Sequence, residues 1–85
     1  MKIFMDTETA QILTEKELRN EFYDLRAEQP ETYDYSFHCY LRNCLSNNGT
    51  LREMDDDAIR GAIFVLAVSG AMGRAREIGK AWKDL

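Results

Sequence analysis

The longest uncharged stretch of the chain, residues 61–73 (GAIFVLAVSGAMG), limits the folds that the sequence can adopt. Arg60 and Arg74 bound this stretch, which is well short of the roughly 20 apolar residues needed to cross a bilayer. An apolar run of this length between charged flanks is typical of a helix that lies inside a soluble domain. We therefore expect a buried core helix here and no association with a membrane.

Small residues recur every four positions through this stretch and beyond it. They are Ala67, Ala71, Ala75 and Gly79. On one continuous helix they would form a narrow ridge, against which a helix of this chain or of a second copy could pack closely. Trp82 extends the apolar side of the ridge, so these five residues predict a self-association surface. Two alternatives stay open: a break at Ser69-Gly70, or a strand formed by the β-branched residues.

The N-terminal part of the chain predicts a β-hairpin followed by a helix. Residues 1–13 contain two short stretches of mixed apolar and polar side chains around the polar turn TETA, which is typical of two short strands. Thr14 and Glu17 have the spacing of a capping box at a helix start, and Pro30 is expected to end that helix. Its apolar face would consist of Leu18, Phe22 and Leu25.

A second helix is expected after Ser36, which is a favoured N-cap residue. Apolar side chains then follow at helical spacing, and the sequence NNG at residues 47–49 is typical of a helix end. Thr50 and Glu53 repeat the spacing of a capping box. This pattern predicts a short helical turn that runs to Met54.

Together these elements predict an α+β fold that is mainly α, in a single small domain of residues 1–85. The short hairpin of residues 1–13 would pack on three or four helices, because two strands alone are marginally stable in water. Residues 14–54 would supply two helices and a short turn, and residues 55–85 an apolar and then basic helical segment. A chain of this length buries a modest core, so we expect either marginal stability or a dimer partner.

No residue pattern predicts catalysis, and none predicts a bound metal or cofactor. His38 is the only histidine, and its neighbour Cys39 would point about 100° away from it on a helix, which does not suit a nucleophile and its base. Adding Cys44 does not give the spacing of a zinc site. The three consecutive aspartates at residues 55–57 lack the pattern of a calcium loop. We therefore expect a protein that is not an enzyme and uses no cofactor.

The cysteines indicate a reducing compartment. Cys39 and Cys44 are five residues apart on a predicted helix, where their Cα atoms do not have the geometry of a disulfide. The sequence MKIFMDTET also lacks the apolar run of a secretory signal peptide. Reduced thiols and a cytoplasmic location are the expected consequence.

Acidic residues concentrate in the first two-thirds of the sequence. Residues 1–57 hold thirteen acidic and six basic side chains, whereas residues 58–85 hold two and five. This distribution suits docking on a basic protein surface and argues against direct binding of nucleic acid, although solubility alone is a simpler explanation. Acids interleaved with tyrosines in a loop suit a basic groove. The candidate partner-binding residues are Glu28, Glu31, Tyr33, Asp34, Asp55, Asp56 and Asp57.

The opening hairpin, the LTEKEL helix start, the QPETYDYSF linker and the NNGTL segment resemble a group of short proteins from phages and prophages of Gram-positive bacteria. The resemblance covers the N-terminal two-thirds of the chain. It implies a mobile-element setting, in which small acidic proteins inhibit host defence systems, including CRISPR effectors, by occupying their basic nucleic-acid-binding surfaces. We accordingly expect a non-catalytic accessory protein, similar to anti-CRISPR inhibitors, that binds a host defence complex in the host cytoplasm.

Two other functions are compatible with the sequence. The chain could be a self-associating helical adaptor with a structural or regulatory role, which would use the small-residue ridge described above. It could instead be a small DNA-binding regulator, because basic side chains recur near the C-terminal end. These are Arg74, Arg76, Lys80 and Lys83.

Overall fold

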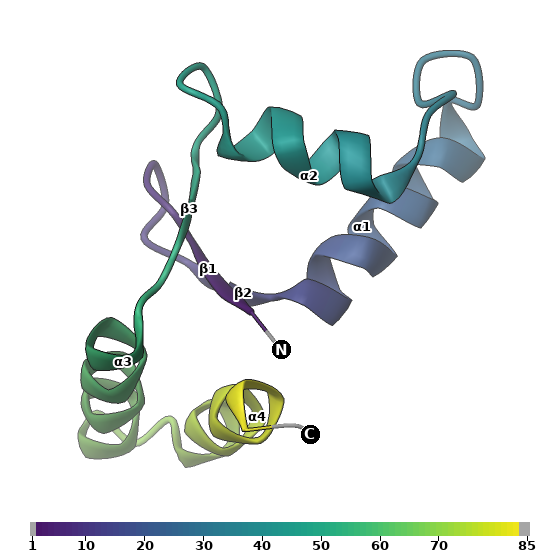
Figure 1. Cartoon of the computed structure of the whole chain (residues 1–85). Helices are drawn as coiled ribbons and strands as arrows, with labels where there is room; N and C mark the ends of the chain where they lie inside the picture. Colours follow the sequence, from purple (N-terminus) through teal and green to yellow (C-terminus); the bar gives the residue numbers. More distant parts are fainter. Residues whose placement is uncertain (1, 84–85) are drawn as a thin grey trace.

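Three strands and four helices follow one another in the order β1-β2-α1-α2-β3-α3-α4 (Figure 1). The computed structural model describes residues 2–83. As the sequence predicts, the fold is α+β and mainly α, with a β-hairpin packed on helices. The elements are β1 (Ile3–Asp6), β2 (Ile12–Thr14), α1 (Glu15–Glu28), α2 (Phe37–Leu45), β3 (Leu51–Glu53), α3 (Asp56–Val68) and α4 (Met72–Trp82).

The sheet consists of three antiparallel strands in the order β2-β1-β3. β1 and β2 form the predicted hairpin, in which Phe4 lies opposite Leu13. On the other side of β1, Phe4 lies opposite Glu53 of β3. In the hairpin turn, the carboxylate of Asp6 accepts a hydrogen bond from the amide of Glu8 at 2.9 Å. The central strand therefore has both of its edges paired.

Residues 50–54 contain this third strand in place of the helical turn that their capping-box spacing predicts. The amide of Thr7 donates to the carbonyl of Thr50 at 2.8 Å, and the amide of Met54 donates to the carbonyl of Ile3 at 2.9 Å. Without these bonds β1 would expose a row of unpaired backbone groups, and one turn of helix offers less hydrogen bonding than the strand does. The prediction of a helical turn is therefore wrong.

α1 begins as the sequence predicts. The Thr14 side chain accepts a hydrogen bond from the amide of Glu17 at 3.2 Å, and the Glu17 carboxylate accepts one from the amide of Thr14 at 2.8 Å. Both halves of the capping box are thus present. The helix ends at Glu28, two residues before Pro30, because the residue preceding a proline disfavours helical geometry. Its buried residues are Leu18 and Phe22.

α2 also has its predicted cap, since the Ser36 side chain accepts a hydrogen bond from the amide of Cys39 at 3.2 Å. After the helix the chain turns back closely on itself. A Cβ atom at Gly49 would overlap the backbone carbonyl of Cys44, so this position requires glycine for a close approach of backbone to backbone. The turn leads directly into β3.

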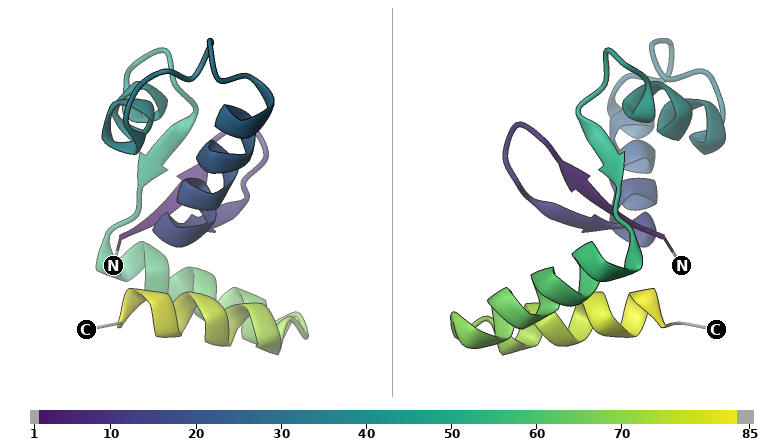
Figure 2. Two further views of the ribbon diagram at one scale, coloured as in Figure 1. Left: turned by 90° about the vertical axis from the view of Figure 1, so that its right-hand side faces the viewer. Right: turned by 60° about the vertical axis from the view of Figure 1, so that its left-hand side comes forward.

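The apolar stretch 61–73 spans two helices. A turn at residues 69–71 separates them, and Gly70 has a φ of +93°, in the region that favours glycine. The amide of Ala71 donates to the carbonyl of Leu66 at 2.8 Å, which closes the end of α3. α4 then folds back beside α3 (Figure 2). The predicted break is confirmed, whereas one continuous helix and a strand are both wrong.

The sheet lies between two pairs of helices. Successive side chains of a strand point to opposite faces, so β1 contributes Ile3 to one face and Phe4 to the other. Ile3 packs with Ile59 of α3 and Ile78 of α4, while Phe4 packs with Leu18 of α1 and with β3. Figure 2 shows α1 and α2 on one side of the sheet and α3 and α4 on the other.

α3 is buried on one side only. Ile59 is buried, but Phe64, Val65 and Val68 expose 69, 63 and 72% of their surface. The prediction of a core helix through residues 61–73 is therefore wrong for the outward side. α3 is apolar around most of its circumference, and periodicity alone does not reveal that only one side meets the sheet and α4.

Candidate functional site

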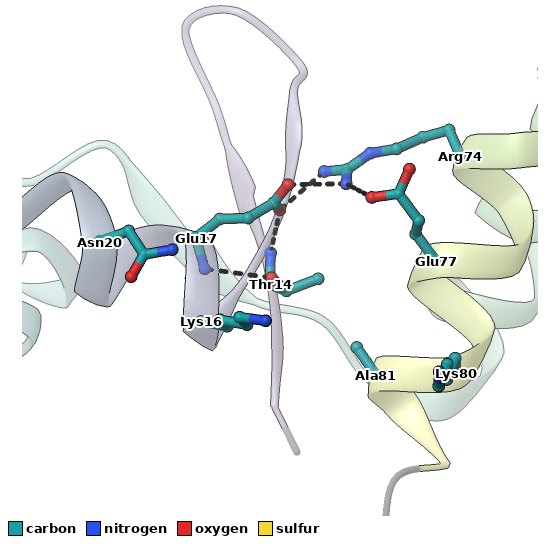
Figure 3. A pocket seen from close by; sticks show the side chains of 8 residues that line it. All are labelled: Thr14, Lys16, Glu17, Asn20, Arg74, Glu77, Lys80 and Ala81. Atoms are coloured by element: carbon teal, nitrogen blue, oxygen red, sulfur yellow. Dashed lines mark hydrogen bonds and ion pairs between the residues drawn. The ribbon is translucent and has the colours of Figure 1, made fainter.

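A groove between the start of α1 and α4 contains a cluster of polar side chains (Figure 3). Arg74 Nη1 donates to Glu17 Oε2 at 2.7 Å, while Nη2 donates to Glu17 Oε1 at 2.8 Å and to the carbonyl of Ile12 at 2.6 Å. Glu77 Oε2 lies 3.5 Å from Nη1. The lining residues are Thr14, Lys16, Glu17, Asn20, Arg74, Glu77, Lys80 and Ala81.

These contacts change the titration of both partners. The hydrogen bonds from Arg74 lower the pKa of Glu17 from its ordinary value of 4.5, and the same contacts raise the pKa of Arg74. Glu17 also accepts the capping hydrogen bond from the amide of Thr14. The donors and acceptors at the centre of the groove therefore satisfy one another. We interpret this cluster as a joint between α1, β2 and α4 that supports the fold.

The residues considered for nucleophilic or metal chemistry do not converge. His38 Nε2 lies 3.2 Å from a guanidinium nitrogen of Arg42, one turn along α2. Cys39 is exposed and Cys44 is half-buried, and both are free thiols. Burial raises the pKa of Cys44, which keeps this thiol protonated at neutral pH. Within residues 2–83, no three His, Cys, Asp or Glu side chains are placed to share a metal ion.

We call residues 28–34, which comprise the last residue of α1 and the acidic segment that follows it, the acidic loop; it lies at one end of the molecule (Figure 1). Its backbone is turned by hydrogen bonds from the amides of Thr32 and Tyr33 to the carbonyl of Gln29, both at 3.1 Å. Among the described residues, none of its three carboxylates has a partner in a salt bridge. The exposed acids are Glu28, Glu31 and Asp34.

Aromatic packing holds the acidic loop against the helices. Phe22 of α1 is fully buried, and the ring centroids of Tyr33 and Tyr40 lie 6.4 and 5.0 Å from it. Tyr35 stacks on the same ring at 6.0 Å. Tyr33, a predicted partner-binding residue, is half-buried, so its ring anchors the loop in addition to any surface that it offers. The carboxylates are therefore displayed from a packed scaffold.

The second predicted acidic group, at the start of α3, has local roles. Asp55 is the N-cap residue, with a side-chain hydrogen bond to a backbone amide at 2.8 Å. Asp56 accepts a hydrogen bond from the indole N–H of Trp82 at 3.1 Å, and Asp57 lies 3.4 Å from Arg60. This group lies on the far side of the sheet from the acidic loop (Figure 1). The structure does not join the two groups into one surface.

The small-residue ridge is divided by the break between the helices. Ala67 belongs to α3, whereas Ala75 and Gly79 belong to α4, and the N-cap residue Ala71 lies between them. Ala75 is buried, and a Cβ atom at Gly79 would lie 3.7 Å from Ile63 Cδ1. On α4 the small residues thus let α3 approach within the same chain. Trp82, predicted beside the ridge, is half-buried at this helix pair.

An exposed apolar surface lies instead on the outward side of α3. We call it the outer face of α3 and define it by Gly61, Phe64, Val65 and Val68, together with Met72 at the start of α4. The sequence reasoning missed this surface. The spacing 61-64-65-68 places these residues on one side of a helix, opposite the buried Ile59 and the half-buried Leu66, but that opposite side is also apolar, so the spacing alone does not indicate which side faces outward.

The basic side chains of α4 and of its C-cap residue, Lys83, are not equivalent. Arg74 is held by Glu17 and Glu77, while Arg76, Lys80 and Lys83 are exposed. A DNA-binding regulator would therefore have these three side chains for phosphate contacts, without Arg74.

No helix within residues 2–83 is both long enough and apolar enough to span a membrane. Comparison with protein-family models, with curated proteins and with solved structures gives no match for this chain. The binding surface proposed for it is therefore inferred from the chain's own residues.

Proposed function

We propose that this chain is a non-catalytic accessory protein of a phage or another mobile element that inhibits a host defence complex. It acts in the host cytoplasm, where the acidic loop covers a basic, nucleic-acid-binding surface of the target. The resemblance of the N-terminal two-thirds to phage proteins gives the setting. The observation that carries the proposal is the acidic loop itself, with three exposed carboxylates free of ion pairs among residues 2–83.

The chemistry of the loop suits a target that normally binds phosphates. Exposed carboxylates present negative charge to arginine and lysine side chains, and complementary charge speeds encounter and fixes the orientation of docking. The loop is also anchored on Phe22 through Tyr33, whose ring centroid lies 6.4 Å away. An ordered loop loses less conformational entropy on binding than a disordered one. The charge of the exposed carboxylates and the ordered backbone of the acidic loop therefore both support docking on a basic surface.

A capture experiment tests this function. The tagged chain is incubated with a nuclease-treated lysate of a Gram-positive host, and the retained proteins are identified by mass spectrometry. We expect recovery of a CRISPR or restriction subunit, together with improved plating of a sensitive phage on cells that produce the chain. Recovery of no defence subunit, or unchanged phage plating, contradicts the proposal.

Matched charge reversals assign the surface. The loop variant carries Glu31→Lys and Asp34→Lys, and the control carries Glu8→Lys and Glu53→Lys, so both change the net charge equally. Glu53 lies 3.6 Å from Lys2 in an exposed pair, which contributes little to stability. We expect the loop variant to lose the captured subunit and the control to retain it. Equal retention by both variants would remove the acidic loop from the binding surface.

A further inference from the structure

Residues 2–83 leave the outer face of α3 uncovered, and we propose that a second copy of this chain covers it. The two outer faces would pack in an antiparallel, two-fold symmetric dimer. This interface differs from the predicted small-residue ridge, which is divided between α3 and α4 and at Gly79 faces Ile63 of the same chain. It is also independent of the acidic loop, which lies on the other side of the sheet.

The exposure of the outer face is the first observation. Phe64, Val65 and Val68 are each more than three-fifths exposed, and Met72 is 46% exposed. A contiguous group of exposed large apolar side chains is uncommon on a small monomer and marks an interaction surface. The whole of residues 61–73 also lacks charge, so a second copy brings no charged group into the centre of the contact.

The small size of the core is the second observation. Eight hydrophobic residues of the described chain are buried. The molecule measures 43 × 25 × 25 Å and has a radius of gyration of 13.8 Å, against about 12 Å for a compact domain of this length. The two clusters therefore form two modest cores instead of one large core. Burial of the outer face would add apolar contacts that the single chain lacks.

The distribution of charge around the face selects the antiparallel arrangement. The start of α3 is acidic, with Asp55, Asp56 and Asp57, whereas the start of α4, beyond the other end of α3, carries Arg76, which is exposed and forms no salt bridge among the described residues. A parallel pair would place the acids of both copies side by side. An antiparallel pair brings the acidic end of each α3 towards Arg76 of the partner subunit, which is the favourable alternative.

The geometry of the helix permits close packing. A Cβ atom at Gly61 would have no neighbour within 4 Å, so no side chain among residues 2–83 covers this position. A partner helix can therefore approach the backbone of α3 beside Phe64. In an antiparallel pair centred between Phe64 and Val65, Gly61 would face Val68 of the partner subunit.

The size of the face sets the expected affinity. Its side chains expose on the order of 400 Å² of apolar surface per copy. Stable specific complexes commonly bury about 800 Å² per partner, so this contact is at the small end. We therefore expect a reversible dimer with a dissociation constant in the micromolar range.

Sedimentation equilibrium tests the dimer. For a chain of 9.9 kDa, we expect the weight-average mass to rise towards twice that value as the concentration approaches about 500 μM. The double variant Phe64→Asp, Val68→Asp should remain a monomer, with its helical circular dichroism unchanged because both side chains are exposed. Tyr23→Asp is the matched control, since Tyr23 is 49% exposed on α1 and should leave the dimer intact.

Disulfide trapping tests the arrangement. The variants Gly61→Cys and Val68→Cys are each prepared with Cys39→Ser, which removes the exposed native thiol. On mixing under mild oxidation, we expect the 61–68 cross-link to form at least about tenfold faster than 61–61 or 68–68, because disulfides require Cα atoms about 5.5–6 Å apart. Predominance of the 61–61 and 68–68 products overturns the antiparallel pairing.

Two results overturn the proposal as a whole. One is a wild-type chain that stays monomeric across the concentration range, which would leave the outer face to a different protein. The other is a dimer that survives the substitutions at Phe64 and Val68. The variant Glu31→Lys, Asp34→Lys should dimerise normally while losing the captured defence subunit. A failure of dimerisation can therefore be told apart from a failure of the acidic loop to bind its target.

Discussion

The carboxylate of Glu17 accepts hydrogen bonds from both Nη atoms of Arg74, which lies 57 positions later in the chain. The same carboxylate completes the capping box of α1, and the same guanidinium reaches the carbonyl of Ile12 in β2. A contact between two residues thus connects α1, β2 and α4. Arg74 is 27% and Glu17 39% exposed, so the salt bridge is partly screened by solvent.

We predict that Arg74→Ala lowers the free energy of unfolding by about 1–2 kcal/mol, because two charge-assisted hydrogen bonds and one bond to a backbone carbonyl are lost. Arg76→Ala is the control, since Arg76 is exposed and has no salt bridge among the described residues. It should change stability by less than about 0.5 kcal/mol. Urea unfolding followed by circular dichroism measures both. Equal losses of stability in Arg74→Ala and Arg76→Ala would contradict the role of Arg74 in joining α1, β2 and α4.

The lowered pKa of Glu17 predicts a loss of stability in acid. The unfolded chain takes up a proton near pH 4.5 and the folded chain at a lower pH. The contribution of this contact is therefore complete above pH 4.5 and is lost as the pH falls through the folded pKa. Glu17→Gln, which keeps a residue suited to the capping box, should cost about 1 kcal/mol at pH 7. Urea unfolding at several pH values should show that the difference in free energy of unfolding between this variant and the wild type shrinks towards pH 3.

The two glycines Gly49 and Gly61 should respond to alanine in opposite ways. At Gly49 the new Cβ atom overlaps the carbonyl of Cys44, so Gly49→Ala should destabilise the fold by about 2–3 kcal/mol. At Gly61, inside α3, the Cβ atom meets nothing within 4 Å, so Gly61→Ala should stabilise by about 0.5–1 kcal/mol. Thermal unfolding at low protein concentration, where dimerisation is negligible, measures both. A neutral Gly49→Ala would contradict the close approach.

The aromatic cluster predicts a large difference between two neighbouring rings. Phe22 is fully buried and Tyr23 is 49% exposed. Phe22→Ala should cost about 3–5 kcal/mol, because it leaves a cavity at the centre of the packed rings. Tyr23→Ala should cost less than about 1 kcal/mol. Urea unfolding compares the two, and limited proteolysis should show earlier cleavage in the acidic loop of Phe22→Ala. Protection of the loop in that variant would argue against its anchoring role.

Local signals predicted the local structure. Thr14 and Glu17 lie within one helical turn, so the start of α1 depends on residues that are close in the sequence. Ser36 at α2 and Gly70 between α3 and α4 are similar cases. Local signals of this kind predict the fold class and most helix boundaries.

Structure that depends on distant partners was not predicted. Leu51 lies opposite Asp6, and no pattern around Thr50 indicates that β1 offers a free edge. The same applies to the salt bridge between Glu17 and Arg74. For α3, apolar residues on nearly all sides concealed which side would face outward, so a buried helix was expected where Phe64 and Val68 are exposed. The candidate partner-binding acids likewise lie in two separate groups, because their positions depend on contacts between distant parts of the chain.

The adjacent positions Ile3 and Phe4 have a consequence for how the molecule opens. Each supplies a fully buried side chain to a different hydrophobic cluster, and both belong to the strand that pairs with the other two. Neither pair of helices can detach without exposing one of these side chains, and β1 cannot leave without disrupting both clusters. Amide hydrogens of β1 should therefore exchange with solvent only through global unfolding, so that the slowest exchange rates report the stability of the entire chain.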